Sequence, residues 1–218
     1  MSISTVVFDF GNVLGFFSHR KAAEQLAAYT DAAPEALQAY LFGDKLEDDF
    51  ESGRLSVEGF RGMVRETFHL RCTDAQFDAA FADMFSPNPD VCPLPALLKP
   101  RYKVLLLSNT NALHASQFVR QFAGVLAPFD ALVLSHEVGL RKPDPRIYEH
   151  CRRLAGRPAG ECLFIDDLPT NVESARACGW QGIVYRPADD LRRRLAEGGV
   201  EVSGARGASK GFDNARSA

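Results

Sequence analysis

Five short apolar runs constrain the fold of this chain more than any other feature. They are rich in β-branched, leucine and aromatic side chains, as buried strands are, and they cover residues 5–10, 102–108, 131–135, 161–167 and 181–186. Helical stretches separate the later runs. Strands and helices that alternate in this way indicate right-handed βαβ units and a parallel sheet covered on both faces. We therefore predict an α/β fold with a doubly wound parallel sheet.

The block between the first two runs has a helical pattern instead. Two mostly apolar groups recur at i, i+3, i+4, i+7 and i+8: Phe60, Met63, Val64, Thr67 and Phe68, then Phe77, Ala80, Phe81, Met84 and Phe85. Ser56 and Thr73 stand where helix N-caps are expected, and Gln76 completes a capping box with Thr73. We expect no strand here. The predicted organisation is an all-helical insert over residues 17–95, a sheet core over 1–16 and 96–200, and a disordered tail over 203–218.

Composition excludes several classes of protein. The 218 residues are 46% hydrophobic and carry 25 basic and 28 acidic side chains, for a formal net charge of -3, which disfavours a strongly basic nucleic-acid binder. No segment approaches the ~18 uncharged apolar residues of a membrane span, and Asp9 comes too early for a signal peptide. Five irregularly spaced cysteines indicate reduced thiols. We predict a cytoplasmic protein with neither a nucleic-acid nor a membrane partner.

Polar residues follow four of the predicted strands. In chain order they are Asp9, then Ser108 and Asn109, then Lys142, then Asp166 and Asp167. Ligands of an open parallel sheet bind outside the carboxyl ends of its strands, so we expect these side chains to lie close together at that edge of the sheet. The set suits phosphoryl transfer to an aspartate, since Mg²⁺, a lysine and hydroxyl or amide donors can together neutralise the repulsion between carboxylate and phosphate.

Each of these residues also has a purely structural explanation. Asp9 could bond a loop amide, Ser108 and Asn109 could cap the next helix, and Lys142 could lie in solvent. Adjacent carboxylates straight after an apolar strand, as in Asp166-Asp167, repel each other unless a cation or donors lie there. Four such features at four consecutive strand ends favour a catalytic site.

The four motifs, FDFGNVL, LSNTN, GLRKPDPRIYEH and FIDDLPTNVESA, resemble those of the haloacid dehalogenase-like (HAD) hydrolase superfamily in order and spacing. The resemblance extends to about residue 200. It implies a Rossmann-like core, and the place of the insert is similar to the helical cap of the subfamily whose cap lies in the first insertion position. Within that subfamily the motifs look most like the alpha-D-glucose 1-phosphate phosphatase-like branch. Response-regulator receivers use a similar residue set, but in another order and on a shorter chain.

The resemblance assigns the handling of the phosphoryl group to four residues. It implies that Asp9 is the nucleophile and forms an aspartyl-phosphate. Ser108 and the amide of Asn109 are implied to hold the phosphoryl oxygens, and Lys142 to balance the charge on nucleophile and phosphate. The implied substrate is a small phosphorylated metabolite.

The resemblance also implies a Mg²⁺ site. Asp167 would ligate the ion together with the Asp9 carboxylate and the backbone carbonyl of Gly11. Asp166 would then orient the metal shell or Lys142. The sequence leaves open which of Asp166 and Asp167 touches the metal.

Gly11 departs from the pattern of most phosphatases in the superfamily, which carry there an aspartate that protonates the leaving oxygen. A positioned general acid contributes typically ~10²–10⁴-fold, so its loss favours substrates with good leaving groups, sugar 1-phosphates first. Two alternatives stay open. A metal-independent haloacid dehalogenase needs no acid at position 11, because halide leaves without a proton, and a non-catalytic member of the superfamily would only bind phosphate or a partner.

Some residues of the insert have an open role. His19, Arg20 and Lys21 could meet an anionic substrate, although a solvated helix start is expected for at least two of them. Phe17 could line a pocket or pack beneath the insert. The acidic run over residues 44–51 is expected on a solvated surface.

Overall fold

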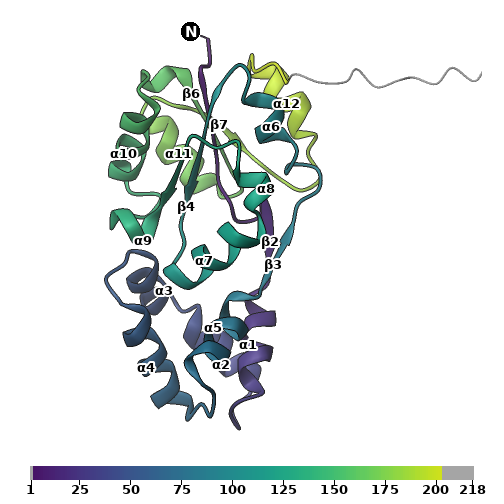
Figure 1. The fold of residues 1–218 in the computed structure, drawn as a ribbon. Coiled ribbons are helices and arrows are strands. Elements are labelled where there is room, and N and C mark those ends of the chain that lie inside the picture. Colours follow the sequence, from purple (N-terminus) through teal and green to yellow (C-terminus); the bar gives the residue numbers. More distant parts are fainter. Residues whose placement is uncertain (1, 203–218) are drawn as a thin grey trace, which may run out of the picture.

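The computed structural model describes residues 2–202, and all five predicted strands form one parallel sheet (Figure 1). The strand order is β5-β4-β1-β6-β7. The strands are β1 (Thr5–Phe8), β4 (Lys103–Ser108), β5 (Ala131–Leu134), β6 (Cys162–Asp166) and β7 (Gln181–Val184). The strand order switches sides at β1, which pairs with β4 on one side and with β6 on the other, so the predicted doubly wound α/β core is confirmed.

Alternating side chains of the central strand β1 pack on the two faces of the sheet. Val6 and Phe8 are fully buried in one cluster and Val7 in another, because successive strand residues point to opposite faces. The first face is covered by α6 (Leu94–Leu98), α7 (Ala112–Gln121), α8 (Ala123–Leu126) and α12 (Leu191–Glu197). The second is covered by α10 (Pro145–Ala155) and α11 (Pro169–Ala177), with α9 (Ser135–Val138) and the 3₁₀ turn Ala159–Glu161 nearby. Both faces of the sheet are therefore buried.

Five helices form the insert, which lies at the end of the molecule away from the N-terminus and α12 (Figure 1). They are α1 (His19–Ala27), α2 (Pro34–Leu41), α3 (Asp44–Glu51), α4 (Val57–Phe68) and α5 (Asp74–Ala82). Their apolar faces enclose a separate cluster that includes the fully buried Phe60 and Phe77. Ser56 and Thr73 are the N-caps of α4 and α5, and the capping box between Thr73 and Gln76 is present. The predicted helical cap and its two helix starts are confirmed.

A two-stranded ribbon joins the cap to the core, and the prediction of no strand in this block was wrong. β2 (Gly15–Phe17) pairs antiparallel with β3 (Phe85–Pro87). Helix α5 ends at Ala82, so Phe85 is not on its apolar stripe; its ring packs edge-on against Phe10 of the core instead. The tertiary contact therefore overrides the helical spacing that Phe85 shares with Phe81.

The predicted domain boundary at residue 96 falls within α6. Val91 and Leu94, which precede that boundary, are buried in the cluster on the sheet. The predicted disordered tail over 203–218 lies outside the described residues. All five cysteines are free, as expected. Within residues 2–202, no helix is long and apolar enough to cross a membrane.

Candidate active site

The register of the sheet brings the predicted site residues to one edge. Phe8 pairs with Ile165 on one side and Leu106 on the other, so Asp9 is level with Asp166 and close to the end of β4. One carboxylate oxygen from each of Asp9, Asp166 and Asp167 lies within 4.8 Å of the other two. A cavity of about 240 Å³ opens here between core and cap, and its lining includes Asp9, Gly11, Ser108, Asn109, Lys142 and Asp167.

Lys142 contacts acids at the carboxyl ends of two neighbouring strands, β1 and β6. Its Nζ lies 2.7 Å from Oδ1 of Asp9 and 2.7 Å from Oδ2 of Asp166. Burial lowers the pKa of this ammonium, but Asp166 and Asp9 outweigh that effect and hold its pKa above the ordinary value. Asn109 fixes the lysine backbone, because its Oδ1 accepts from the Lys142 N–H (2.8 Å) and its Nδ2 donates to the Lys142 carbonyl (2.9 Å). Lys142 is thus held as a cation between two carboxylates.

Asp166 and Asp167 have different surroundings although they are adjacent. Asp166 is fully buried, and besides Lys142 it accepts hydrogen bonds from the Leu168 N–H (2.8 Å) and from Nδ2 of Asn171 (3.1 Å). Asp167 is half-buried, lines the cavity and accepts from Nδ2 of Asn12 (3.0 Å). The Asp166 oxygens are therefore occupied by protein donors, whereas Asp167 faces the cavity.

Three acids of this site share one cation, Lys142. Burial raises the pKa of the Asp9 carboxyl to about 8; Lys142 opposes that shift, and Asp166 and Asp167 add to it. Burial also raises the pKa of Asp167. Mg²⁺ prefers hard oxygen donors, and its charge would favour the ionised form of carboxyl groups whose pKa is raised by burial and by one another. The residues present therefore fit the metal that the motifs imply.

Phe17 occupies the space beside Gly11. A Cβ built at position 11 would lie 3.0 Å from Cε1 of the Phe17 ring, which is tighter than ordinary van der Waals contact. The backbone of Gly11 is outside the left-handed region, whereas the next residue, Asn12, has a φ of 53°. Steric contact with Phe17, rather than backbone strain, therefore opposes a side chain at this position.

The alternative role for Ser108 and Asn109 as helix caps is wrong. The N-cap of α7 is Asn111, whose side chain accepts from the His114 N–H. Oγ of Ser108 is 3.3 Å from the Asn109 carbonyl, and both residues line the cavity. Asn12 and Asn171 were missed as site residues, although both belong to the quoted motifs.

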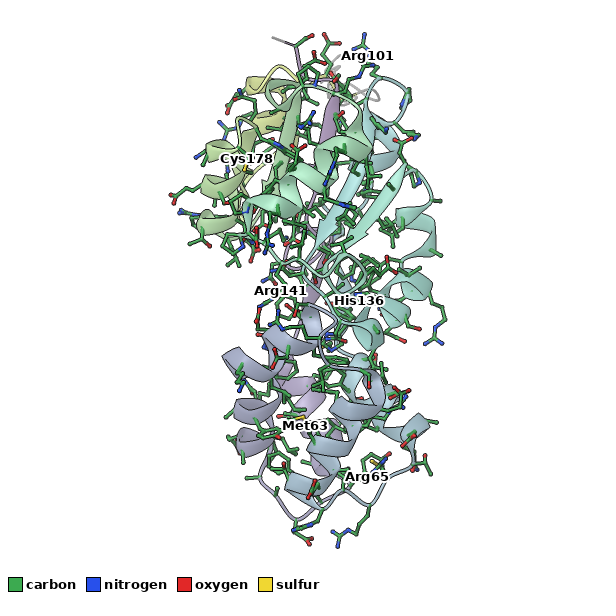
Figure 2. The ribbon with its side chains drawn as sticks, turned by 90° about the vertical axis from the view of Figure 1, so that its left-hand side faces the viewer. Met63, Arg65, Arg101, His136, Arg141 and Cys178 are labelled. Atoms are coloured by element: carbon green, nitrogen blue, oxygen red, sulfur yellow. The ribbon has the colours of Figure 1, made fainter. Side chains whose placement is uncertain are left out.

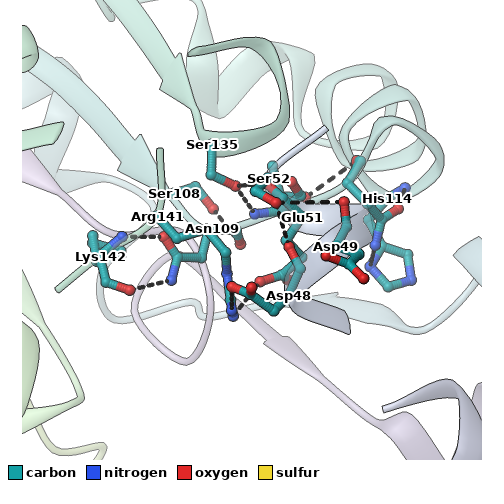
Figure 3. A network of polar contacts seen from close by, with 12 residues as sticks. Asp48, Asp49, Glu51, Ser52, Ser108, Asn109, His114, Ser135, Arg141 and Lys142 are labelled. Atoms are coloured by element: carbon teal, nitrogen blue, oxygen red, sulfur yellow. Dashed lines mark hydrogen bonds and ion pairs between the residues drawn. The ribbon is translucent and has the colours of Figure 1, made fainter. Parts of the chain in front are cut away.

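Arg141 ties the cap to the core beside the site, and the sequence did not indicate it. Its guanidinium bonds Oδ1 of Asp48 and Oε2 of Glu51, each at 2.7 Å, and both acids belong to α3. In Figure 2 Arg141 lies at the junction of the two parts, and Figure 3 shows the polar network around it. The acidic run over 44–51 is therefore not simply a solvated surface, because two of its carboxylates bind the core.

Two further contacts bring the end of α3 and the residues just after it close to the core. The Ser135 hydroxyl donates to the Glu51 carbonyl (2.5 Å) and accepts from the Thr110 N–H (2.8 Å). Gly53, with a φ of +69°, lies so near His136 that a Cβ would be 2.3 Å from the His136 carbonyl oxygen. A side chain at residue 53 is therefore excluded both by conformation and by space.

Aromatic rings form the cap-side wall of the cavity. The lining includes Phe17, His19, Phe85 and His114. Burial lowers the pKa of His19 to about 4 and that of His114 to about 3, so both rings are neutral at pH 7.

The two basic residues that follow His19 do not line the cavity. Arg20 pairs with Glu24, and Lys21 pairs with Asp83 at 3.0 Å, in exposed positions. A solvated helix start was expected for at least two of the three basic residues, and Arg20 and Lys21 confirm it.

Known proteins resemble this chain over most of its length. A family model described as haloacid dehalogenase-like hydrolase matches residues 3–179. A phosphatase from Mycobacterium tuberculosis is 29% identical over 217 residues, which are 94% of this chain and 99% of that protein. D-ribitol-5-phosphate phosphatase from Bacteroides thetaiotaomicron is 26% identical over 88% of this chain and 97% of its own. A crystal structure of a HAD family enzyme from the same organism, in complex with magnesium and inorganic phosphate, superposes with a TM-score of 0.74 at 26% identity and covers 89% of this chain and 100% of that one.

Proposed function

Because this chain belongs to the haloacid dehalogenase-like hydrolase family, we propose that it is a Mg²⁺-dependent phosphomonoester hydrolase that acts through an aspartyl-phosphate. The observation that carries the proposal is the geometry at Lys142, whose Nζ lies 2.7 Å from both Asp9 and Asp166, with the Asp167 carboxylate close by. Two relatives named as phosphatases and a neighbour solved with magnesium and phosphate support it. The substrate is a small phosphorylated metabolite, sized to the cavity of about 240 Å³.

In the first step an Asp9 carboxylate oxygen attacks phosphorus. The bond from phosphorus to the ester oxygen breaks, and its electron pair leaves with that oxygen. The protonated Lys142 offsets the charge gathered on nucleophile and phosphoryl group, while the Ser108 hydroxyl and the Asn109 amide donate to the phosphoryl oxygens. Water then attacks the phosphorus of the aspartyl-phosphate, the bond from phosphorus to the Asp9 oxygen breaks, and inorganic phosphate and the Asp9 carboxylate form as the water gives up a proton to solvent.

Three groups are assigned to the metal: the Asp9 carboxylate, the Asp167 carboxylate and the Gly11 carbonyl. Mg²⁺ bound there supplies positive charge that lets an anionic phosphate approach Asp9. Asp166 is a positioning residue, because its oxygens are occupied by Lys142, Leu168 and Asn171.

The absence of an acid at Gly11 selects the leaving group. An alkoxide that leaves without a proton is costly, and the loss of a positioned acid costs typically ~10²–10⁴-fold. An anomeric oxygen is a better leaving group than the oxygen of a primary alcohol. The proposed preference is therefore for sugar 1-phosphates over sugar 6-phosphates.

A haloacid dehalogenase is the second candidate, because halide leaves without a proton and Gly11 fits such a reaction. The adjacent acids Asp166 and Asp167 argue against it, since a metal-independent reaction has no cation to hold there. Dehalogenation of 2-chloropropionate in EDTA would favour this candidate over the phosphatase.

A phosphate screen with Mg²⁺ tests the proposal. Sugar, acyl and nucleotide phosphates are compared for the wild type, the wild type in EDTA, and Asp9→Asn. Hydrolysis that disappears in EDTA and in the variant supports the phosphatase, and a higher kcat/KM for glucose 1-phosphate than for glucose 6-phosphate supports the leaving-group preference. Total inactivity, with no effect of Asp9→Asn, would favour a protein that only binds phosphate or a partner.

A further inference from the structure

We propose that the cap-side wall of the cavity, formed by Phe17, His19, Phe85 and His114, selects monophosphates whose leaving group is an uncharged ring and rejects a second anionic group. The inference rests on the proposed function, because it describes the part of the substrate beyond the phosphate. It assigns specificity to side chains of the β2–β3 ribbon, the cap and α7, none of which takes part in the chemical step.

The rings of this wall are held by stacking on other rings. His19 stacks on Phe42 with centroids 3.8 Å apart and an angle of 4°, and it also contacts Phe17 at 5.0 Å. His114 stacks on Phe81 at 4.4 Å and meets Phe85 edge-on at 5.5 Å. A preformed set of aromatic faces and edges suits the flat faces of a ring better than a flexible acyclic chain.

The orientation of His114 is fixed by Asn111. Side-chain Oδ1 of Asn111 accepts from the backbone N–H of His114, so Nδ2 of Asn111 is left to donate to Nδ1 of the His114 ring at 2.9 Å. This bond places the proton of the neutral ring on Nε2, which is buried. His114 is thus a rigid, neutral part of the wall.

The cations that line the cavity are already matched by carboxylates. Lys142 is bonded to Asp9 and Asp166, and Arg141 to Asp48 and Glu51. Each therefore faces two acids before any ligand enters. One phosphate at the metal end is balanced by Mg²⁺ and Lys142, whereas a second anion at the wall would have no such partner.

The neutral state of two rings of the wall strengthens this discrimination. The two histidines of the wall stay neutral at pH 7, since burial lowers the pKa of both. An anionic group on the leaving group would lose its water beside neutral rings and beside cations that already bind carboxylates, which is unfavourable.

Phe17 links this selection to the missing acid. Cε1 of its ring lies 3.0 Å from where a Cβ at position 11 would stand, so a side chain there would press on this ring. Aryl and glycosyl leaving groups meet both requirements. Each stabilises the oxyanion that leaves without an acid, and each has a ring that can pack against the cap-side wall.

Two aryl phosphates of equal shape and different charge test the proposal. We expect kcat/KM for 4-carbamoylphenyl phosphate to exceed that for 4-carboxyphenyl phosphate by at least ~10-fold in the wild type with Mg²⁺. His19→Lys, which adds a cation to the wall, should reduce this ratio at least ~3-fold. His150→Lys, the same substitution on α10 outside the cavity lining, should leave the ratio unchanged.

Glucose 1-phosphate and glucose 1,6-bisphosphate extend the comparison to glycosyl rings. We expect glucose 1-phosphate to have a higher kcat/KM than glucose 1,6-bisphosphate, which carries a second anionic group. If glucose 1-phosphate also exceeds 4-carbamoylphenyl phosphate, the preferred ring is a glycosyl group; otherwise it is an aryl group.

The outcomes that overturn the proposal are separate from failure of the proposed function. Equal efficiency for the carbamoyl and carboxyl compounds would overturn it, because the wall would not discriminate charge. So would hydrolysis of acetyl phosphate that depends on Asp9, combined with no hydrolysis of any ring phosphate. If no phosphate is hydrolysed in an Asp9-dependent way, the proposed function itself is wrong. The comparison of wild-type substrates decides even if His19→Lys fails to fold.

Discussion

Cε1 of Phe17 lies 3.0 Å from the point where a Cβ on residue 11 would stand, so this ring crowds the space next to Gly11. Phe17 belongs to β2, which pairs with β3 and carries the chain from core to cap. The same contact therefore disfavours a side chain at residue 11 and connects the site to the strand that leads into the cap.

Restoring the acid should require removal of this ring. We expect Gly11→Asp alone to give little gain, because Phe17 blocks the new side chain. Gly11→Asp with Phe17→Ala should raise kcat/KM for glucose 6-phosphate by at least ~10-fold, within reach of the ~10²–10⁴-fold that a positioned acid supplies. Steady-state kinetics, with Phe17→Ala alone as control, check this. A gain from Gly11→Asp equal to that of the double variant would contradict the steric explanation.

Arg141 should hold the cap against the core. Arg141→Ala removes two contacts between the parts and leaves the largely buried Glu51 carboxylate without its partner. We expect a loss of about 1–3 kcal/mol in the free energy of unfolding and faster amide exchange in α3. Urea denaturation and hydrogen exchange measure the two effects.

Arg54→Ala is the matched control for this prediction. Arg54 also contacts Asp48, but it is exposed and lies within the cap. We expect it to change neither stability nor exchange measurably. Equal effects of the two substitutions would show that Arg141 has no special role between cap and core.

His114 should make the protein less stable in mild acid. Burial lowers its pKa from 6.5 to about 3, so between these values the unfolded state binds a proton that the folded state does not. The free energy of unfolding should therefore fall below pH 6.5 by up to ~1.4 kcal/mol per pH unit from this group. His114→Phe keeps a ring against Phe81 and should make the decline between pH 6.5 and 5 shallower. Thermal melts across this range check it, and parallel curves for both proteins would refute the assignment.

Mg²⁺ should stabilise the folded protein through Asp167. A cation that binds only the folded state adds about 2.7 kcal/mol at 100 times its Kd. We expect MgCl₂ to raise the Tm of the wild type and to raise that of Asp167→Asn much less. Asp31→Asn, at a highly exposed position in the cap, serves as the control. A shift in Asp167→Asn as large as in the wild type would place the metal elsewhere.

The sheet and the helical insert could be predicted because their signals are local. β-Branched and leucine-rich runs mark each strand, and Ser56 and Thr73 mark helix starts by their own hydrogen bonding. The β2–β3 ribbon could not be predicted, since its strands are three residues long and Phe85 shares helical spacing with Phe81. Only the contact of Phe85 with Phe10 shows where that ring packs.

The candidate site was predictable for a similar reason. Residues that directly follow buried strands meet at one edge whatever the loops do, and this places Asp9 beside Asp166. The partners of Arg141 depend instead on how the cap sits on the core, which no spacing within one element reveals. The neutral state of His19 follows from the same packing, since burial between rings lowers its pKa.

Trapping a phosphoryl group on Asp9 tests the central claim most directly. The wild type with Mg²⁺ and glucose 1-phosphate, or the best substrate of the screen, is quenched in acid during turnover, and the peptide that contains Asp9 is analysed by mass spectrometry. We predict one added phosphoryl group on Asp9, absent in EDTA and in Asp9→Asn. Phosphate release at an undiminished rate by Asp9→Asn, with no phosphorylated peptide from the wild type, would contradict the account.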